Sequence, residues 1–68
     1  MKMIPVSSSN LSSVGYENGT LHVRFNSGSL YSYSEVPSYV YDELLNAPSK
    51  GRYLAAHIKG HYSYNRIG

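Results

Sequence analysis

The stretch Ser49-Lys50-Gly51-Arg52 contains the residue types that bind an anion at the start of a helix. Ser49 can cap such a helix, whose first backbone N–H groups have no partner inside it. Gly51 lets a ligand approach the backbone, and the charges of Lys50 and Arg52 favour phosphate. The alternative is a capped helix with solvated cations, and the sequence leaves both interpretations open.

The basic residues are concentrated near the C-terminus. Residues 1–48 carry two cations and four acids, whereas residues 49–68 carry four cations and no acid. If this last stretch contacts phosphates and a tyrosine stacks on a base, binding to nucleic acid should weaken steeply as salt rises. The candidate nucleic-acid-binding or anion-binding residues are Ser49, Lys50, Gly51, Arg52, Tyr53, Lys59 and Arg66.

Other chemistry finds little support in the sequence. His57 and His61 are spaced as two ligands on one helical face, but Gly60 is expected to end the helix between them. No third His, carboxylate or Cys lies nearby, and no serine sits in a recognisable nucleophile elbow. We therefore expect no catalytic residue, no metal site, no cofactor and no enzymatic activity.

Length and composition bound the size of the core. With 68 residues, of which 41% are hydrophobic, the chain is expected to form a single domain over residues 1–68 with one thin core. Eight tyrosines supply much of the apolar surface, and the absence of cysteine excludes disulfides. No apolar run resembles a signal peptide or a membrane span, so we expect a soluble, cytoplasmic protein.

A first β-hairpin is predicted around Asn18-Gly19, the strongest short hairpin signal, because both residues tolerate positive φ. The flanking strands are residues 11–16 and 21–25, joined by a two-residue type I′ turn. Their apolar residues then share one face of the sheet. The predicted pairs are Tyr16 with Leu21, Val14 with Val23, and Ser12 with Phe25.

A second hairpin is predicted at Asn26-Ser27-Gly28. We favour a three-residue turn with Gly28 in the left-handed position and a bulge. This register places Tyr31 and Tyr33 on the core face, where they would face the helices and be unable to stack on bases. A two-residue turn would instead expose both rings for stacking. The bulged register pairs Phe25 with Ser29, Val23 with Tyr31, and Leu21 with Tyr33.

Two short helices are predicted after the sheet. Pro37 can occupy the first position of one helix, whose apolar residues recur at four-residue spacing. A second helix is expected from Lys50 to Lys59, with Leu54 and Ile58 buried and with Arg52, Ala56 and Lys59 together on another face. The alternation in residues 61–67 allows a short edge strand. The recurring residues of the first helix are Val40, Tyr41, Leu44 and Leu45.

Several of these segments, in this order, resemble the KTSC domain. This family is named for the C-terminal extension of some lysyl-tRNA synthetases and also occurs as small stand-alone proteins of bacteria and phages. The resemblance implies a domain without a defined biochemical role, with RNA binding suggested by the synthetase attachment. Ala55 and Ser63 depart from residues common in the family. The matching segments are residues 6–16, Gly28, 31–33, 36–37, 49–53, 57–58 and Tyr62.

The sequence thus predicts an α+β fold, a three-stranded antiparallel meander packed by two short helices, with the option of a short C-terminal strand. The expected function is a small non-enzymatic binding module for RNA or other nucleic acid, acting through the basic C-terminal patch. The alternative is a protein-interaction or homodimerisation module, and no membrane partner is expected.

Overall fold

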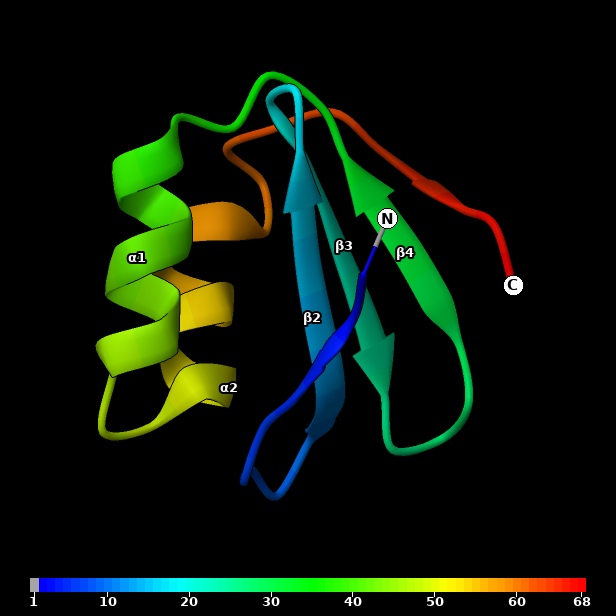
Figure 1. Cartoon of the computed structure of the whole chain (residues 1–68), viewed down its shortest axis with the longest axis vertical. Helices are drawn as coiled ribbons and strands as arrows, with labels where there is room; N and C mark the ends of the chain where they lie inside the picture. The colour runs from blue at the N-terminus through cyan, green and yellow to red at the C-terminus, as the bar shows by residue number, and fades with distance from the viewer. Residues whose placement is uncertain (1) are drawn as a thin grey trace.

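The computed structural model describes residues 2–68, and within them five strands form one antiparallel sheet in the order β1-β2-β3-β4-β5 (Figure 1). The predicted α+β class and meander are confirmed, and so is the short C-terminal strand. The prediction missed β1, a two-residue edge strand in which Ile4 pairs with Val14 and Pro5 with Ser13. The strands are β1 (Ile4–Pro5), β2 (Leu11–Glu17), β3 (Thr20–Phe25), β4 (Leu30–Tyr33) and β5 (Tyr64–Arg66).

The first hairpin joins β2 and β3 through Asn18 and Gly19, with φ angles of 52° and 80°. Positive φ at both positions confirms the type I′ turn. The pairs Tyr16 with Leu21 and Val14 with Val23 are also confirmed.

One predicted pair in this hairpin is wrong. Leu11, not Ser12, lies opposite Phe25, because the register shifts between Leu11 and Ser13. This irregularity leaves Ser12 as an extra residue and turns Leu11 to the core face, where it is buried. Burial of a leucine explains why the bulge is favoured over the regular register.

The second hairpin has the predicted bulged turn. Gly28 has a φ of 98°, and the Phe25 N–H donates to the Ser29 carbonyl over 2.9 Å. The strand pairs that follow are those expected, Val23 with Tyr31 and Leu21 with Tyr33. Both tyrosines are therefore on the face of the sheet that the helices cover.

The first helix, α1 (Ser38–Asn46), begins one residue later than predicted, because Pro37 occupies the capping position and not the first helical position. Its residues Val40 and Leu44 are buried, as the four-residue spacing indicated. Tyr41 stacks on Tyr16 with ring centroids 5.2 Å apart. These contacts hold α1 against the β2 side of the sheet.

The second helix begins at the predicted residue but changes geometry halfway. An α-helical turn, α2 (Lys50–Tyr53), continues into a π-helical turn, η1 (Leu54–Ile58), and the chain leaves the helix at Lys59. The Lys59 N–H donates to the Leu54 carbonyl over 2.8 Å, which is the i→i−5 bond of a π-helix. Leu54 and Ile58 are buried as predicted, and Gly60 follows with a φ of 81°.

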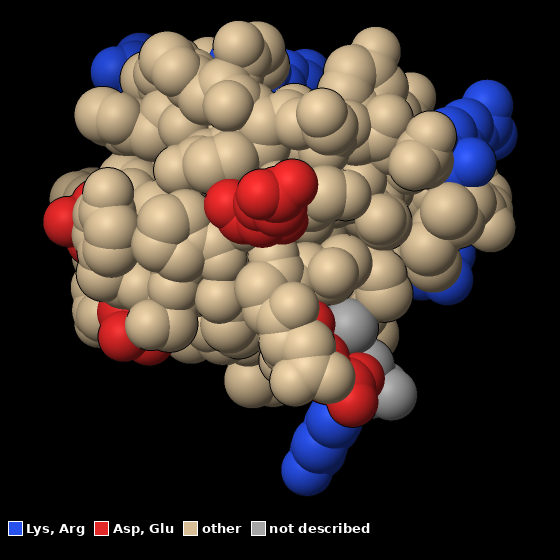
Figure 2. All heavy atoms as spheres, turned by 90° about the horizontal axis from the view of Figure 1, so that it is seen from above, with Lys and Arg blue, Asp and Glu red and all other residues tan. Residues whose placement is uncertain are grey.

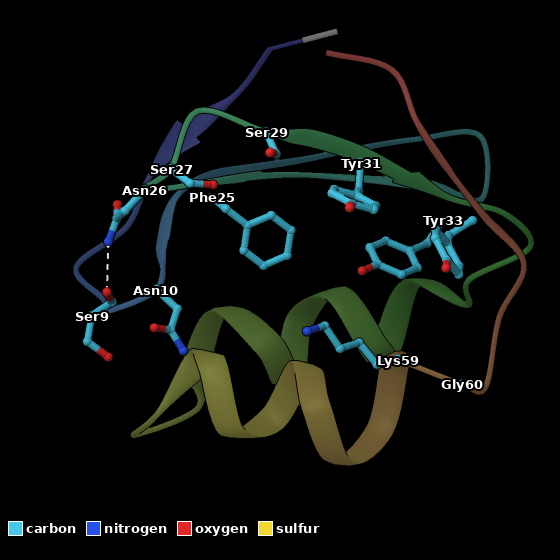
Figure 3. A pocket seen from close by; sticks show the side chains of 11 residues that line it. Ser9, Asn10, Phe25, Asn26, Ser27, Ser29, Tyr31, Tyr33, Lys59 and Gly60 are labelled. Atoms are coloured by element: carbon cyan, nitrogen blue, oxygen red, sulfur yellow. Dashed lines mark hydrogen bonds between the residues drawn. The ribbon is translucent and has the colours of Figure 1, made fainter.

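The wider turn alters where Lys59 points. A regular helix would have placed Lys59 beside Arg52 and Ala56, whereas the helix ends before Lys59, whose side chain is exposed as predicted. The Lys59 side chain extends toward the sheet, with its Nζ 5.8 Å from the centre of the Phe25 ring (Figure 3). The extra residue in the π turn accounts for this rotation.

Candidate functional site

A groove of about 800 Å³ lies between the end of η1 and the helix-facing side of β3, β4 and β5 (Figure 3). This volume is in the range of about 300–1,000 Å³ that is typical of ligand sites. Side chains from segments far apart in the sequence line it. They are Ser9, Asn10, Phe25, Asn26, Ser27, Ser29, Tyr31, Tyr33, Lys59, Gly60 and Tyr64.

Four aromatic rings form one side of the groove. Phe25 meets Tyr31 edge to face at 5.5 Å, and Tyr31 lies 5.7 Å from Tyr64. Tyr33 is buried, with 2% of its surface exposed, whereas Tyr64 at 59% is one of the most exposed large side chains. Burial, followed by the neighbouring Tyr31 and Tyr64, raises the pKa of Tyr33, so its phenol stays neutral at ordinary pH.

Tyr31 and Tyr33 lie where the bulged register predicted them. The bulged register does place Tyr31 and Tyr33 toward the helices, as expected. Both rings nevertheless line an open groove, so the expectation that they cannot stack on bases stays a prediction. Tyr31 is only half-buried, so part of its ring is accessible from the groove.

The other end of the groove is polar, and hydrogen bonds hold it in place. Asn26 donates from Nδ2 to the Ser9 carbonyl over 2.9 Å (Figure 3) and to the Ser8 carbonyl over 3.3 Å. These bonds fasten the turn between β3 and β4 to the loop before β2. Ser27 and Asn10 complete this end with exposed polar side chains.

Lys59 provides the charge of the groove. Among the described residues that line the groove, Lys59 is the one cation, and none is Asp or Glu. Its ammonium group lies in the middle of the groove, over Phe25 and between the polar end and the tyrosines (Figure 3). The groove therefore complements a ligand that carries negative charge at its centre and a flat apolar group at one end.

The residues predicted to bind an anion at the start of α2 are largely occupied with protein contacts. Ser49 caps the helix, its hydroxyl accepting from the Arg52 N–H over 3.4 Å. Lys50 Nζ donates to the Ala47 carbonyl over 3.3 Å. A Cβ on Gly51 would lie 2.8 Å from Asn10 Nδ2, so the glycine permits close packing at this point. Arg52 is exposed.

Tyr53 and Arg66 lie elsewhere. The Tyr53 hydroxyl donates to Glu43 Oε1 over 2.5 Å, and burial together with this hydrogen bond raises the pKa of Tyr53 to about 12. Arg66 is on β5 opposite Tyr31, and its Nε donates to the Gly68 carbonyl over 3.0 Å. An acid beside Tyr53 makes that part of the surface less suited to phosphate.

One of the four predicted cations belongs to the groove. Lys59 lines the groove, whereas Lys50, Arg52 and Arg66 do not. On the face seen in Figure 2, the Lys and Arg side chains lie apart at the margins, and Asp and Glu side chains lie between them.

Sequence reasoning missed the polar end and the role of Phe25 in this groove. The predicted register already put Phe25 and Tyr31 on one face, which was the available signal. Within residues 2–68, no group of three His, Cys, Asp or Glu could hold a metal ion. No helix in the described part of the chain is long and apolar enough to cross a membrane.

Residues 7–62 match the family model of the KTSC domain. The chain belongs to the KTSC family. The crystal structure of a KTSC domain protein from Yersinia pestis is 36% identical and superposes with a TM-score of 0.95, covering 98% of this chain and 97% of that one. The resemblance drawn from the sequence motifs is thus confirmed, together with the fold.

Relatives of this KTSC domain include both small and large proteins. An uncharacterised protein of Stutzerimonas stutzeri is 46% identical over 70 residues, covering 98% of this chain and 99% of that protein. A lysine–tRNA ligase of Nostoc sp. (strain PCC 7120) is 50% identical over 48 residues. That match covers 71% of this chain but only 9% of the ligase, so the chain corresponds to a small part of the enzyme.

Proposed function

We propose that this KTSC domain is a small, non-enzymatic module that binds RNA or other nucleic acid in unpaired form, with the aromatic groove as its contact surface. The observation that carries the proposal is the combination of Phe25, Tyr31 and Tyr64 with Lys59 in a groove whose described lining has no acid. Aromatic platforms with a nearby cation are the usual means of binding single strands without base pairing.

The geometry favours an unpaired strand over a duplex. Tyr31 and Tyr64 are 5.7 Å apart and face into a groove, so a base must leave its stack to reach them. Bases in single strands, loops and ends are free to do so, whereas duplex bases would first have to be unpaired. Stacking of one base on such a ring contributes about 1–3 kcal/mol.

The relatives favour RNA as the nucleic acid. Lysine–tRNA ligases, as their name states, act on tRNA, and a segment similar to this domain lies within them. That segment is 9% of the ligase, so it would add an RNA contact to the enzyme rather than its chemistry. For this role we also propose a cytoplasmic location.

Fluorescence anisotropy with a labelled single-stranded RNA tests the proposal. Tyr64→Ala should weaken binding by about 5- to 100-fold through lost stacking, and Lys59→Gln should weaken it severalfold. Tyr39→Ala is the matched control, because Tyr39 is 61% exposed on α1 and Tyr64 is 59% exposed. Arg52→Gln is the control for charge. Equal effects of Tyr64→Ala and Tyr39→Ala, or equal affinity for the duplex of the same sequence, would contradict the proposal.

A protein-interaction role is the second candidate, favoured by the edge strand β5. This strand ends the strand order of the sheet, and beside it Tyr64 and Ile67 expose 59% and 52% of their surfaces. Exposed edges and apolar side chains are the features through which strands pair between chains. Light scattering over a range of concentrations would show a dimer that Ile67→Asp converts to monomer. A monomer at every concentration would exclude self-association.

A further inference from the structure

The groove differs in chemistry along its length (Figure 3). One end carries the rings of Tyr31, Tyr33 and Tyr64, and the opposite end carries the polar groups of Asn10 and Ser27. The Lys59 ammonium lies between them. A ligand that fills the whole groove therefore needs a flat ring, then a negative charge, then a group rich in hydrogen-bonding atoms.

The tyrosines are arranged to hold one base on one side only. Tyr31 and Tyr33 are close to parallel, at 23°, with centroids 6.5 Å apart, and they project from alternate positions of β4. Side chains two residues apart on a strand stand next to each other on one face, which makes a platform rather than a slot between two rings. Tyr64 extends this platform at 6.0 Å from Tyr33. Because Tyr33 is 2% exposed, a base meets this platform through Tyr31 and Tyr64.

The charge of the groove matches one phosphodiester. Lys59 is the single cation among its described lining residues, so a second phosphate would find no partner inside it. In a strand, one phosphodiester separates each sugar and base from the next. With a base on the tyrosines and its 3′ or 5′ phosphate at Lys59, the adjoining sugar and base edge reach the polar end.

We propose that the groove binds one dinucleotide step. One base stacks on Tyr31 and Tyr64, the phosphodiester meets Lys59, and the adjoining nucleoside contacts the Asn10 and Ser27 end. The proposal rests on the proposed function and names its minimal ligand. The volume of about 800 Å³ is in the upper part of the usual range for small-ligand sites, which suits a ligand larger than one nucleotide.

This arrangement predicts an order of affinities that charge alone does not. Adenosine monophosphate carries nearly two negative charges, whereas the dinucleoside monophosphate ApA carries one. If attraction to Lys59 were the main interaction, the mononucleotide would bind at least as well. If the step fills the groove, ApA binds roughly fivefold more tightly, because it adds the contacts at the polar end.

NMR titration tests whether the groove binds one dinucleotide step. The ligands are adenosine monophosphate, ApA and a longer oligoadenylate. Chemical-shift changes should centre on Tyr31, Tyr64 and Lys59 for all three ligands. Asn10→Ala combined with Ser27→Ala should remove the advantage of ApA over the mononucleotide, and Lys59→Gln should weaken all three. Thermal melting of each variant confirms that it is folded.

The salt dependence gives a second readout. One phosphate contact predicts a slope of about −0.7 in the logarithm of affinity against the logarithm of salt, and a patch of four cations predicts a slope roughly four times as steep. A steep slope would contradict binding of one dinucleotide step. So would ApA that binds no more tightly than the mononucleotide while binding of the oligomer still depends on Tyr64. Either result leaves the proposed RNA-binding function standing. Absence of binding by the oligomer at low salt overturns both.

Discussion

Gly51 lies in the first turn of α2, directly against the side chain of Asn10. An alanine Cβ there would lie 2.8 Å from Asn10 Nδ2 and 3.5 Å from its Cβ and Cγ. Alanine in a helix is more stable than glycine by about 1 kcal/mol, whereas moving a side chain off its preferred rotamer costs about 0.5–1.5 kcal/mol. Because the two terms nearly cancel, we expect Gly51→Ala alone to change the free energy of unfolding by less than about 0.5 kcal/mol.

Removing the Asn10 side chain separates the two terms. In an Asn10→Ala background, Gly51→Ala meets no obstruction and should stabilise the domain by about 1 kcal/mol. Urea unfolding of the four proteins of this double-mutant cycle, followed by circular dichroism, gives the coupling energy directly. With a slope of about 1 kcal/mol per molar urea for so short a chain, the midpoint should rise by about 1 M. A Gly51→Ala change that destabilises the Asn10→Ala protein would refute the steric argument.

The same variant separates packing from ligand binding at the Ser49–Arg52 stretch. Adenosine monophosphate is the ligand for this test, because the proposed mononucleotide site does not include Asn10. If Gly51 is present for its contact with Asn10, the folded Gly51→Ala protein binds adenosine monophosphate as well as the parent does. If the variant has the parent's stability but has lost this binding, the backbone of the turn is the phosphate site. Stability and binding must therefore be measured on the same preparations.

Three further changes have defined outcomes. Folding raises the pKa of Tyr53 from 10 to about 12, so the contribution of this side chain to stability is complete below pH 10 and is lost as the pH rises toward 12. Urea unfolding across that range should show a smaller loss of stability for Tyr53→Phe than for the parent. Leu54→Ala, at a side chain 1% exposed, should cost about 2–5 kcal/mol and lower the melting temperature sharply. Gly28→Ala should cost about 1–2 kcal/mol in urea unfolding because its φ is 98°, whereas the neighbouring Ser27→Ala should cost little.

The two hairpins were predictable because their turns are set by local residues. Asn18-Gly19 and Gly28 have the positive φ angles that their residue types tolerate, and the strand registers follow from the turns. The bulge at Ser12 was not predictable in this way. It depends on burying Leu11 against helices that come later in the chain, which no local preference expresses.

The edge strand β1 was missed for a related reason. It has two residues, and one of them, Pro5, is depleted in strands and lacks an N–H to donate. Its pairing with β2 is visible only once β2 is in place. Proline is tolerated there because β1 lies at an edge of the sheet, where one side of the strand faces no neighbour.

The candidate site was predicted least well, and the π turn is the reason. Leu54 and Ile58 are four residues apart and both buried, which is the pattern of an ordinary α-helix and gives no sign of a wider turn. Under that pattern Lys59 belongs on the face of Arg52. The i→i−5 bond to Leu54 instead turns Lys59 over the Phe25 ring, where it becomes the charge of an aromatic groove. Single π turns are often found at functional sites, and here one such turn decides whether Lys59 lies beside Arg52 on a helix face or lines a groove with charge at its centre.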